Sequence, residues 1–156
     1  MTTSIIFGSR VGRQGKVRLG CSAALFDRTK QKVLLTRRTD NGLWCLPGGM
    51  VDPGETVAEC CEREVLEETG LKVRVVHLTG VYSDPDQLIV YPDDNLSHSI
   101  VLGFLVEQVG GKPRLSNETS DIRFFPDLEA IEMPLFHGHA IHIRDALAGQ
   151  DAAYIR

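Results

Sequence analysis

Acidic side chains crowd into one short stretch of the chain, residues 52–68. The stretch holds one basic residue, Arg63, against seven carboxylates: Asp52, Glu55, Glu59, Glu62, Glu64, Glu67 and Glu68. On a helix that turns about 100° per residue, Glu64, Glu67 and Glu68 fall within an arc of roughly 100°. Oxygen ligands gathered on one face are what Mg²⁺ and Mn²⁺ prefer in proteins.

The ordinary explanation of such a stretch is a solvated helix surface. Two features favour a metal site instead. Glu64 and Glu68 form a like-charge pair four residues apart, which destabilises an isolated helix. The preceding turn contains Gly48 and Gly49, and glycine exposes backbone oxygens and lets another group approach closely. The carboxylates also border the apolar stripe of the helix, which is formed by Val57, Ala58, Cys61 and Val65. Acidic residues alone leave the choice between the two open.

The element that must position these carboxylates is a helix over Val57–Thr69. Thr56, followed three residues later by Glu59, is a capping-box signature for its start. Gly70 is a typical residue for its end. These signals are local, so this helix is the firmest structural prediction from the chain.

Strands are predicted on both sides of this helix, at Val17–Phe26, Val33–Arg37, Leu43–Leu46, Leu71–Tyr82, Ser99–Val109, Lys112–Leu115 and Ile122–Phe125. Gly110-Gly111 reads as a hairpin turn, Ser83–His98 as a polar loop, and His137–Leu147 as a closing helix. This order of elements predicts an α/β fold, with a mixed sheet covered on two faces.

Composition limits the kinds of partner. The 156 residues are 42% hydrophobic and 24% charged, which is an ordinary balance for one globular core. The formal net charge of −4 argues against nucleic-acid or anionic-membrane binding. A phosphate-bearing substrate would therefore need a local group that neutralises it.

Targeting and redox signals point to the cytoplasm. The four cysteines contain no C-x-x-C pair and are expected to be reduced thiols: Cys21, Cys45, Cys60 and Cys61. No apolar run is long enough to span a bilayer. The basic first residues lack the apolar core of a signal peptide, and several glycines disfavour a targeting helix. Residues 1–16 are accordingly expected to be an extended arm.

The spacing of the acidic stretch resembles a family signature. Gly49, five residues, Glu55, seven residues and then the run from Arg63 to Leu71, REVLEETGL, match every defined position of the Nudix box. That box reads G-x5-E-x7-R-E-U-x-E-E-x-G-U, where U is a bulky apolar residue. Its many fixed positions make it far more specific than a lone three-glycine motif. The resemblance extends over most of the chain, from about Arg18 onward.

The resemblance implies a Nudix α/β/α sandwich with a central mixed β-sheet, spanning residues 17–150 and followed by a short tail, 151–156. It implies a cytoplasmic enzyme that cleaves a nucleoside diphosphate linked to another moiety, by means of metal-activated water. ADP-ribose, a nucleotide-sugar and a (d)NTP are the candidate substrates, and Mg²⁺ (or Mn²⁺) is the expected cofactor. Relatives often form homodimers.

Roles for individual residues follow by position in the box. Metal ligands are expected to be the carboxylates of Glu64, Glu67 and Glu68, together with the carbonyl of Gly48. Arg63 would orient these glutamates, and Glu55 would brace the loop. The catalytic carboxylates are expected among Glu64, Glu67 and Glu118, with Glu67 or Glu118 as the general base.

Residues outside the box carry weaker signals. Arg37 and Arg38 end a strand and suit phosphate contact, although a solvated strand end is about as good an explanation. Tyr82 and Asp84 border the polar loop and are candidates for substrate binding, because long loops in compact domains are often binding loops. Trp44 is expected in the core. His137, His139 and His142 resemble a metal tract, but short histidine groups at a helix start are more often surface residues.

Two other functions compete with hydrolysis of a small nucleotide. One is a catalytically silent Nudix-fold module that binds a nucleotide; such modules would be expected to lose box glutamates, and this chain keeps all of them. The other is an RNA-directed activity, which the net charge disfavours.

Overall fold

The computed structural model describes residues 2–156; Met1, the first residue of the expected arm, lies outside them. The elements in chain order are β1 (Ser4–Phe7), η1 (Val11–Gln14), β2 (Lys16–Leu25), β3 (Lys32–Arg38), β4 (Trp44–Cys45), β5 (Gly48–Met50), α1 (Val57–Thr69), β6 (Leu71–Tyr82), β7 (Gln87–Val90), β8 (Leu96–Gly111), β9 (Thr119–Pro126), α2 (Asp127–Glu132), α3 (His139–Ala148) and β10 (Tyr154–Ile155). No helix among residues 2–156 is long and apolar enough to cross a membrane.

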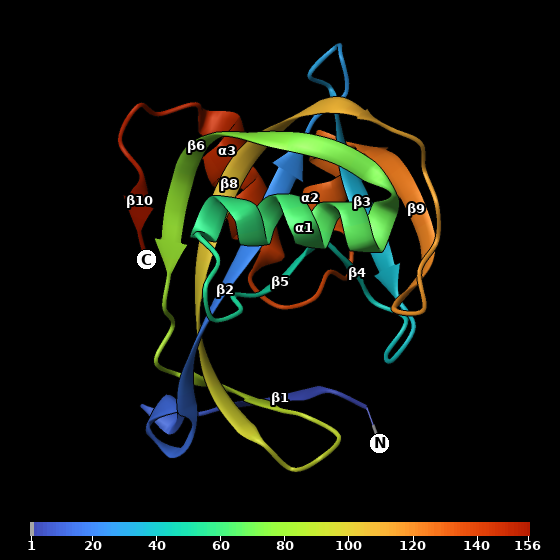
Figure 1. Cartoon of the computed structure of the whole chain (residues 1–156). Coiled ribbons are helices and arrows are strands. Elements are labelled where there is room, and N and C mark those ends of the chain that lie inside the picture. Colours follow the sequence, from blue (N-terminus) through green and yellow to red (C-terminus); the bar gives the residue numbers. More distant parts are fainter. Residues whose placement is uncertain (1) are drawn as a thin grey trace.

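The main sheet is mixed. Its strands run in the order β1-β7-β8-β2-β5, and β6 pairs with β8 at one edge and with β10 at the other. β8 lies parallel to β2 but antiparallel to β6. A second sheet has the order β4-β3-β9. Figure 1 shows α1 on one side of the sheets and α2 and α3 on the other, so the predicted α/β/α sandwich with a central mixed sheet is confirmed.

Two apolar cores hold these layers together. The first lies between α1 and the main sheet and is formed by Cys21, Ala23, Leu25, Leu34, Cys60, Cys61, Val65, Leu71, Val73, Phe104 and Val106. The second lies beneath α2 and α3 and is formed by Val33, Leu35, Leu46, Ala130 and Ile143. Trp44 packs against this second core and against the ring of Phe125, as expected of a core tryptophan. Because each core sits on a different face, both helical layers are fixed.

Helix α1 has the predicted bounds. The Thr56 hydroxyl accepts the Glu59 backbone N–H at 3.2 Å, and the Glu59 carboxylate accepts the Thr56 N–H at 2.7 Å. Gly70 ends the helix with a φ of 74°, a left-handed conformation that glycine adopts without strain. The apolar face buries Cys60, Cys61 and Val65, which leaves the glutamates along its border.

The first residues of the chain form a layer below the main body. β1 pairs antiparallel with β7, and β7 pairs with the start of β8. In Figure 1 this layer lies beneath α1, at the lower end of β2 and β8. The expected loop Ser83–His98 therefore contains a strand, β7, whose Leu88 and Ile89 are buried. A short apolar run inside a polar segment is a weak sequence signal, and it was missed.

Two further expectations about elements were wrong, and two elements were not expected. Lys112–Leu115 is not a strand, and Gly110-Gly111 does not turn a hairpin: the chain crosses to β9, which pairs with β3 in the other sheet. Helix α2, which was not expected, follows directly on Pro126, because proline is tolerated at a helix start. Strand β10 lies in the expected tail and pairs in parallel with β6. These pairings are long-range, so local residue types do not reveal them.

Candidate active site

In the loop before α1, two glycines lie in close contact with the backbone of β2 and with the side chain of Glu64. β5 pairs antiparallel with β2, with Gly48 opposite Ser22 and Gly49 opposite Cys21. A Cβ atom on Gly48 would overlap the Cys21 carbonyl, and one on Gly49 would overlap the carboxylate of Glu64. Both glycines are therefore required by space, and Glu64 is pressed directly against the loop.

Arg63 binds the acidic side chains to this loop. Its guanidinium donates to both oxygens of Glu55, at 2.9 and 2.7 Å, and to the Met50 carbonyl at 3.1 Å. Its Nη1 donates to Glu64 at 2.8 Å and to Glu67 at 3.2 Å. The hydrogen bond from Arg63 is the largest effect that holds the pKa of Glu55 down at about 2. Arg63 therefore orients Glu64 and Glu67, and Glu55 holds the Arg63 guanidinium in place.

Glu68 is the most strongly perturbed carboxylate of the cluster. Burial raises its pKa to about 8; the Gly48 N–H that it accepts at 3.3 Å opposes this shift, and the charges of Glu64 and Glu118 add to it. The pKa of Glu64 is raised as well, first by burial, with contributions from Glu67 and Glu118. Carboxylates from α1 and from the loop before β9 thus share one negative field.

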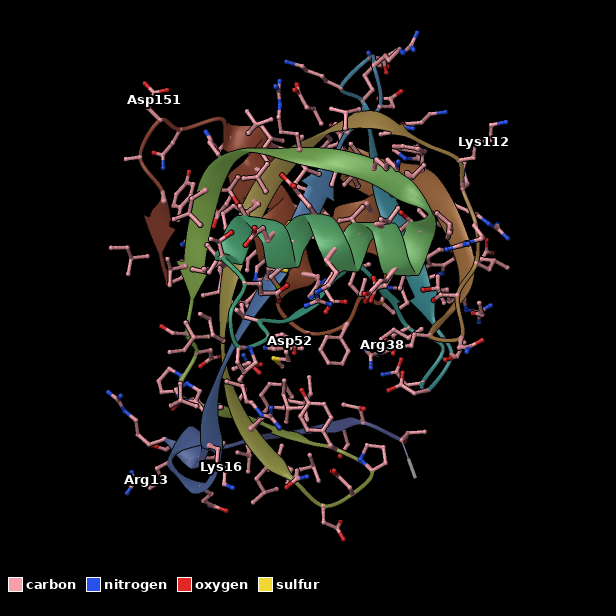
Figure 2. The ribbon with its side chains drawn as sticks, viewed as in Figure 1. Arg13, Lys16, Arg38, Asp52, Lys112 and Asp151 are labelled. Carbon is pink, nitrogen blue, oxygen red and sulfur yellow. The ribbon has the colours of Figure 1, made fainter. Side chains whose placement is uncertain are left out.

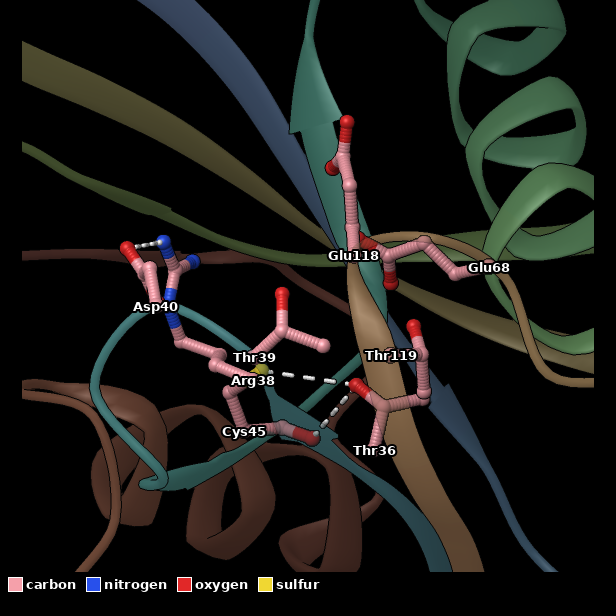
Figure 3. Close-up of a pocket in the computed structure, with 8 residues that line it drawn as sticks. All are labelled: Thr36, Arg38, Thr39, Asp40, Cys45, Glu68, Glu118 and Thr119. Atoms are coloured by element: carbon pink, nitrogen blue, oxygen red, sulfur yellow. Dashed lines mark hydrogen bonds and ion pairs between the residues drawn. The ribbon is translucent and has the colours of Figure 1, made fainter.

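Glu118 enters this field from a distant part of the chain. Its backbone is fixed by the Thr39 N–H, which donates to the Glu118 carbonyl at 3.0 Å, and by the Ser116 hydroxyl, which accepts the Glu118 N–H at 3.2 Å. Figure 3 shows Glu68 reaching from α1 toward Glu118. Together with Arg38, these two carboxylates line a small cavity of about 180 Å³.

This small cavity adjoins a much larger cleft of about 960 Å³. Its walls include the carboxylates of Glu64, Glu67 and Glu68, the start of α3, and residues of the β6–β7 connection and of β7. The cleft lies between α1 and the lower layer. In Figure 2, Arg38 and Asp52 mark that level, whereas Arg13 and Lys16 of the basic arm lie in the lower layer and line neither cavity.

Of the other predicted site residues outside the box, three line the cleft and one does not. Arg38, Tyr82 and Asp84 line the cleft, and Arg37 lines neither cavity; its Nε donates to the Gly42 carbonyl at 3.0 Å. Arg38 is paired with Asp40 at 2.7 Å. The nearby carboxylate therefore already balances part of the charge that Arg38 could offer to a phosphate.

Sequence reasoning missed how the helix α3 histidines are used. The Nδ1 atom of His139 accepts the Leu46 backbone N–H at 2.8 Å, and the Nδ1 atom of His142 lies 2.9 Å from the Ser22 hydroxyl. Burial lowers the pKa of His139 to about 4 and that of His142 well below its usual value. Three histidines within six residues were the signal, but His139 and His142 bond to a backbone N–H and a hydroxyl of the protein itself, and the ring of His137 packs against that of Phe7.

The box carboxylates fit a hard divalent cation in donor chemistry. Among residues 2–156, no three His, Cys, Asp or Glu side chains stand close enough to hold a metal ion as they are placed. The reason is visible in their contacts: Arg63 holds Glu64 and Glu67, while the Gly48 N–H holds Glu68. A bound cation would take its oxygen donors from this set, which lines one cleft.

The structure is an α/β/α sandwich with a central mixed sheet. Its candidate active site is a cleft lined by a glycine-containing loop and an acidic helix. The family model for the NUDIX domain matches residues 16–146. The chain therefore belongs to the Nudix family.

Individual relatives agree with this assignment. The chain is 40% identical over 97 residues to an ADP-ribose pyrophosphatase of Methanocaldococcus jannaschii; the match covers 60% of this chain but only 54% of that protein. It is 36% identical over 127 residues to a MutT-like protein of Streptomyces ambofaciens, covering 81% of this chain and 75% of the relative. The solved structure of an ADP-ribose pyrophosphatase from Streptococcus suis superposes with a TM-score of 0.69 at 24% identity, over 89% of this chain and 98% of that one. At that identity the structural match shows the fold alone.

Proposed function

We propose that this Nudix protein is an Mg²⁺- or Mn²⁺-dependent pyrophosphohydrolase that cleaves a nucleoside diphosphate linked to another group. The observation that carries the proposal is the convergence of Glu64, Glu67, Glu68 and Glu118 at one cleft large enough for a nucleotide. Such a negative field repels a diphosphate unless cations lie between them.

The box residues have defined tasks in this proposal. Glu64, Glu67, Glu68 and the Gly48 carbonyl hold the cations. When bound, divalent cations polarise phosphoryl oxygens, neutralise the diphosphate and lower the pKa of a coordinated water. Arg63 keeps the glutamates directed at the cleft.

Glu118 is the better placed of the two candidate general bases. The Glu67 carboxylate is already engaged by a hydrogen bond from Arg63, at 3.2 Å. The Glu118 carboxylate takes no hydrogen bond from residues 2–156, and Glu118 lines the cleft together with Glu68. We therefore assign Glu118 to proton removal from the attacking water.

ADP-ribose is the first substrate to test, ahead of nucleotide-sugars and (d)NTPs. The name of the 40% identical relative supports this order. The cleft of about 960 Å³ and the adjoining cavity of about 180 Å³ are both lined by Glu68 and Glu118, so groups attached to a diphosphate at these carboxylates have space to bind. We propose a cytoplasmic enzyme, because its four cysteines are free thiols, acting on a small nucleotide rather than on nucleic acid or a membrane. Sedimentation tests whether it is a homodimer.

A substrate panel with Mg²⁺ tests the proposal. Wild type is expected to release a nucleoside monophosphate from at least one compound. Glu67→Gln and Glu68→Gln are expected to lose more than about 100-fold in kcat/KM, beyond the usual cost of losing an outer partner of a metal ligand. The matched control is Glu62→Gln on the same helix, since Glu62 faces β6 and accepts the Val75 N–H. It should keep wild-type activity.

Two outcomes would contradict the proposal. Tight nucleotide binding without turnover in the presence of Mg²⁺ or Mn²⁺ would favour the silent binding module. Equal activity of wild type and both glutamine variants would show that the Glu67 and Glu68 carboxylates have no role in the reaction.

A further inference from the structure

A row of stacked rings lies along the cleft wall that α3 supplies. The rings of Tyr82 and His142 stack with centroids 3.7 Å apart, and those of His142 and His139 with centroids 5.3 Å apart. The edge of Phe136 meets His139, and the Arg38 guanidinium lies 4.9 Å from the Phe136 ring centre. Rings packed in a row have little freedom to move singly, so their nitrogen atoms are held in fixed places.

Both histidines in this row hold the segment that carries Gly48. His139 accepts the N–H of Leu46, two residues before Gly48. His142 bonds to the hydroxyl of Ser22, the residue paired with Gly48 in the β2–β5 ladder. The two imidazoles thus fix the loop from the helical layer opposite α1, where the carboxylates lie (Figure 1).

The far end of the row is anchored by an ion pair between a buried carboxylate and an exposed arginine. The Tyr82 hydroxyl donates to Asp145 at 2.9 Å, and Asp145 is only 4% exposed. Arg156 donates to both oxygens of that carboxylate at 2.8 Å. Arg156 is itself held beside β6, where its N–H donates to the Val81 carbonyl. Because a buried carboxylate requires such a partner, Tyr82 has a rigid support.

We infer that His139 and His142 are positioning residues for metal binding. They hold the Leu46–Gly48 segment at a set separation from α1, and with it the Gly48 carbonyl and the Gly48 N–H that Glu68 accepts. Moving this segment displaces a backbone oxygen and a carboxylate together. The inference rests on the proposed function, in which these groups hold the cation.

The test compares three histidine variants by Mn²⁺ binding, measured by electron paramagnetic resonance, and by kcat and KM. His139→Leu removes the acceptor and is expected to weaken Mn²⁺ binding about tenfold, as loss of an outer support of a metal site typically does. The loss should appear in kcat at fixed Mn²⁺ more than in KM for the nucleotide. His139→Asn keeps an acceptor near the Nδ1 position and should restore most of the affinity. His77→Leu, on β6 and outside both cavities, should match wild type.

A further, smaller substitution keeps the test valid if His139→Leu fails to fold. Ser22→Ala deletes only the hydroxyl that meets His142 and should weaken Mn²⁺ binding severalfold in a folded protein, checked by circular dichroism. Wild-type Mn²⁺ affinity in folded His139→Leu or in Ser22→Ala overturns the inference, as does His139→Asn behaving like His139→Leu. Absence of Mn²⁺ binding in wild type itself overturns the proposed function, and this inference with it.

Discussion

The carboxylate of Glu64 occupies the space where a side chain at position 49 would begin. The Gly49 position of the box is therefore a steric requirement of Glu64 where it lies, rather than a requirement of backbone conformation. Arg63 is also required by its contacts. Its guanidinium donates at once to Glu55, to the Met50 carbonyl, to Glu64 and to Glu67, and a lysine cannot make this set of hydrogen bonds.

Gly49→Ala tests this steric requirement. The new methyl group should push the Glu64 carboxylate away from the loop, weakening Mn²⁺ binding and lowering kcat about 10- to 100-fold, the usual range for a disturbed metal-site support. Gly8→Ala is the control, because its methyl group meets only the Val11 side chain, at 3.8 Å. An unchanged Mn²⁺ affinity in Gly49→Ala would show that Glu64 is not positioned by this contact.

At the scale of elements, α3 is sensitive to acid. The folded His139 has a pKa near 4, chiefly because of burial, while an unfolded histidine titrates near 6.5. The unfolded chain therefore binds more protons between these values, so the stability that His139 contributes is present above pH 6.5 and is lost as the pH falls toward 4. The loss amounts to about 3 kcal/mol at most.

Urea unfolding at pH 7, 6 and 5 measures this effect. Wild type should lose more stability across the range than His139→Asn, which has no imidazole to protonate but keeps an acceptor for Leu46. The comparison cancels contributions from carboxylates that titrate in the same range. Parallel stability curves for the two proteins would place the acid sensitivity elsewhere.

How far each element could be predicted depended on how local its signals are. Helix α1 carries its own start and stop in Thr56, Glu59 and Gly70, and its bounds were predicted from the sequence alone. Strands β7 and β10 exist because distant strands offer them free edges, so residue types gave little warning of them. The site divides in the same way. Box glutamates could be placed by spacing, whereas the contact of His139 with Leu46 joins residues 93 positions apart.

At the scale of the whole molecule, the cleft lies where separate units of structure meet. α1 and the loop before β9 supply the carboxylates. α3, the segment before it and the end of β6 supply the ring row, and residues of the β1–β7 layer line the lower side. A chain of net charge −4 has no general attraction for a polyanion. In the proposed function, divalent cations therefore balance the charge of the substrate at the cleft, where oxygen donors from α1 and from the loop before β9 converge.

The most direct measurement is a crystal soaked in Mn²⁺ with a non-hydrolysable nucleotide diphosphate, examined by anomalous scattering. Manganese peaks are expected beside Glu64, Glu67 and Glu68, with the diphosphate in contact with them. A nucleotide bound in the cleft with no manganese at α1 would contradict it.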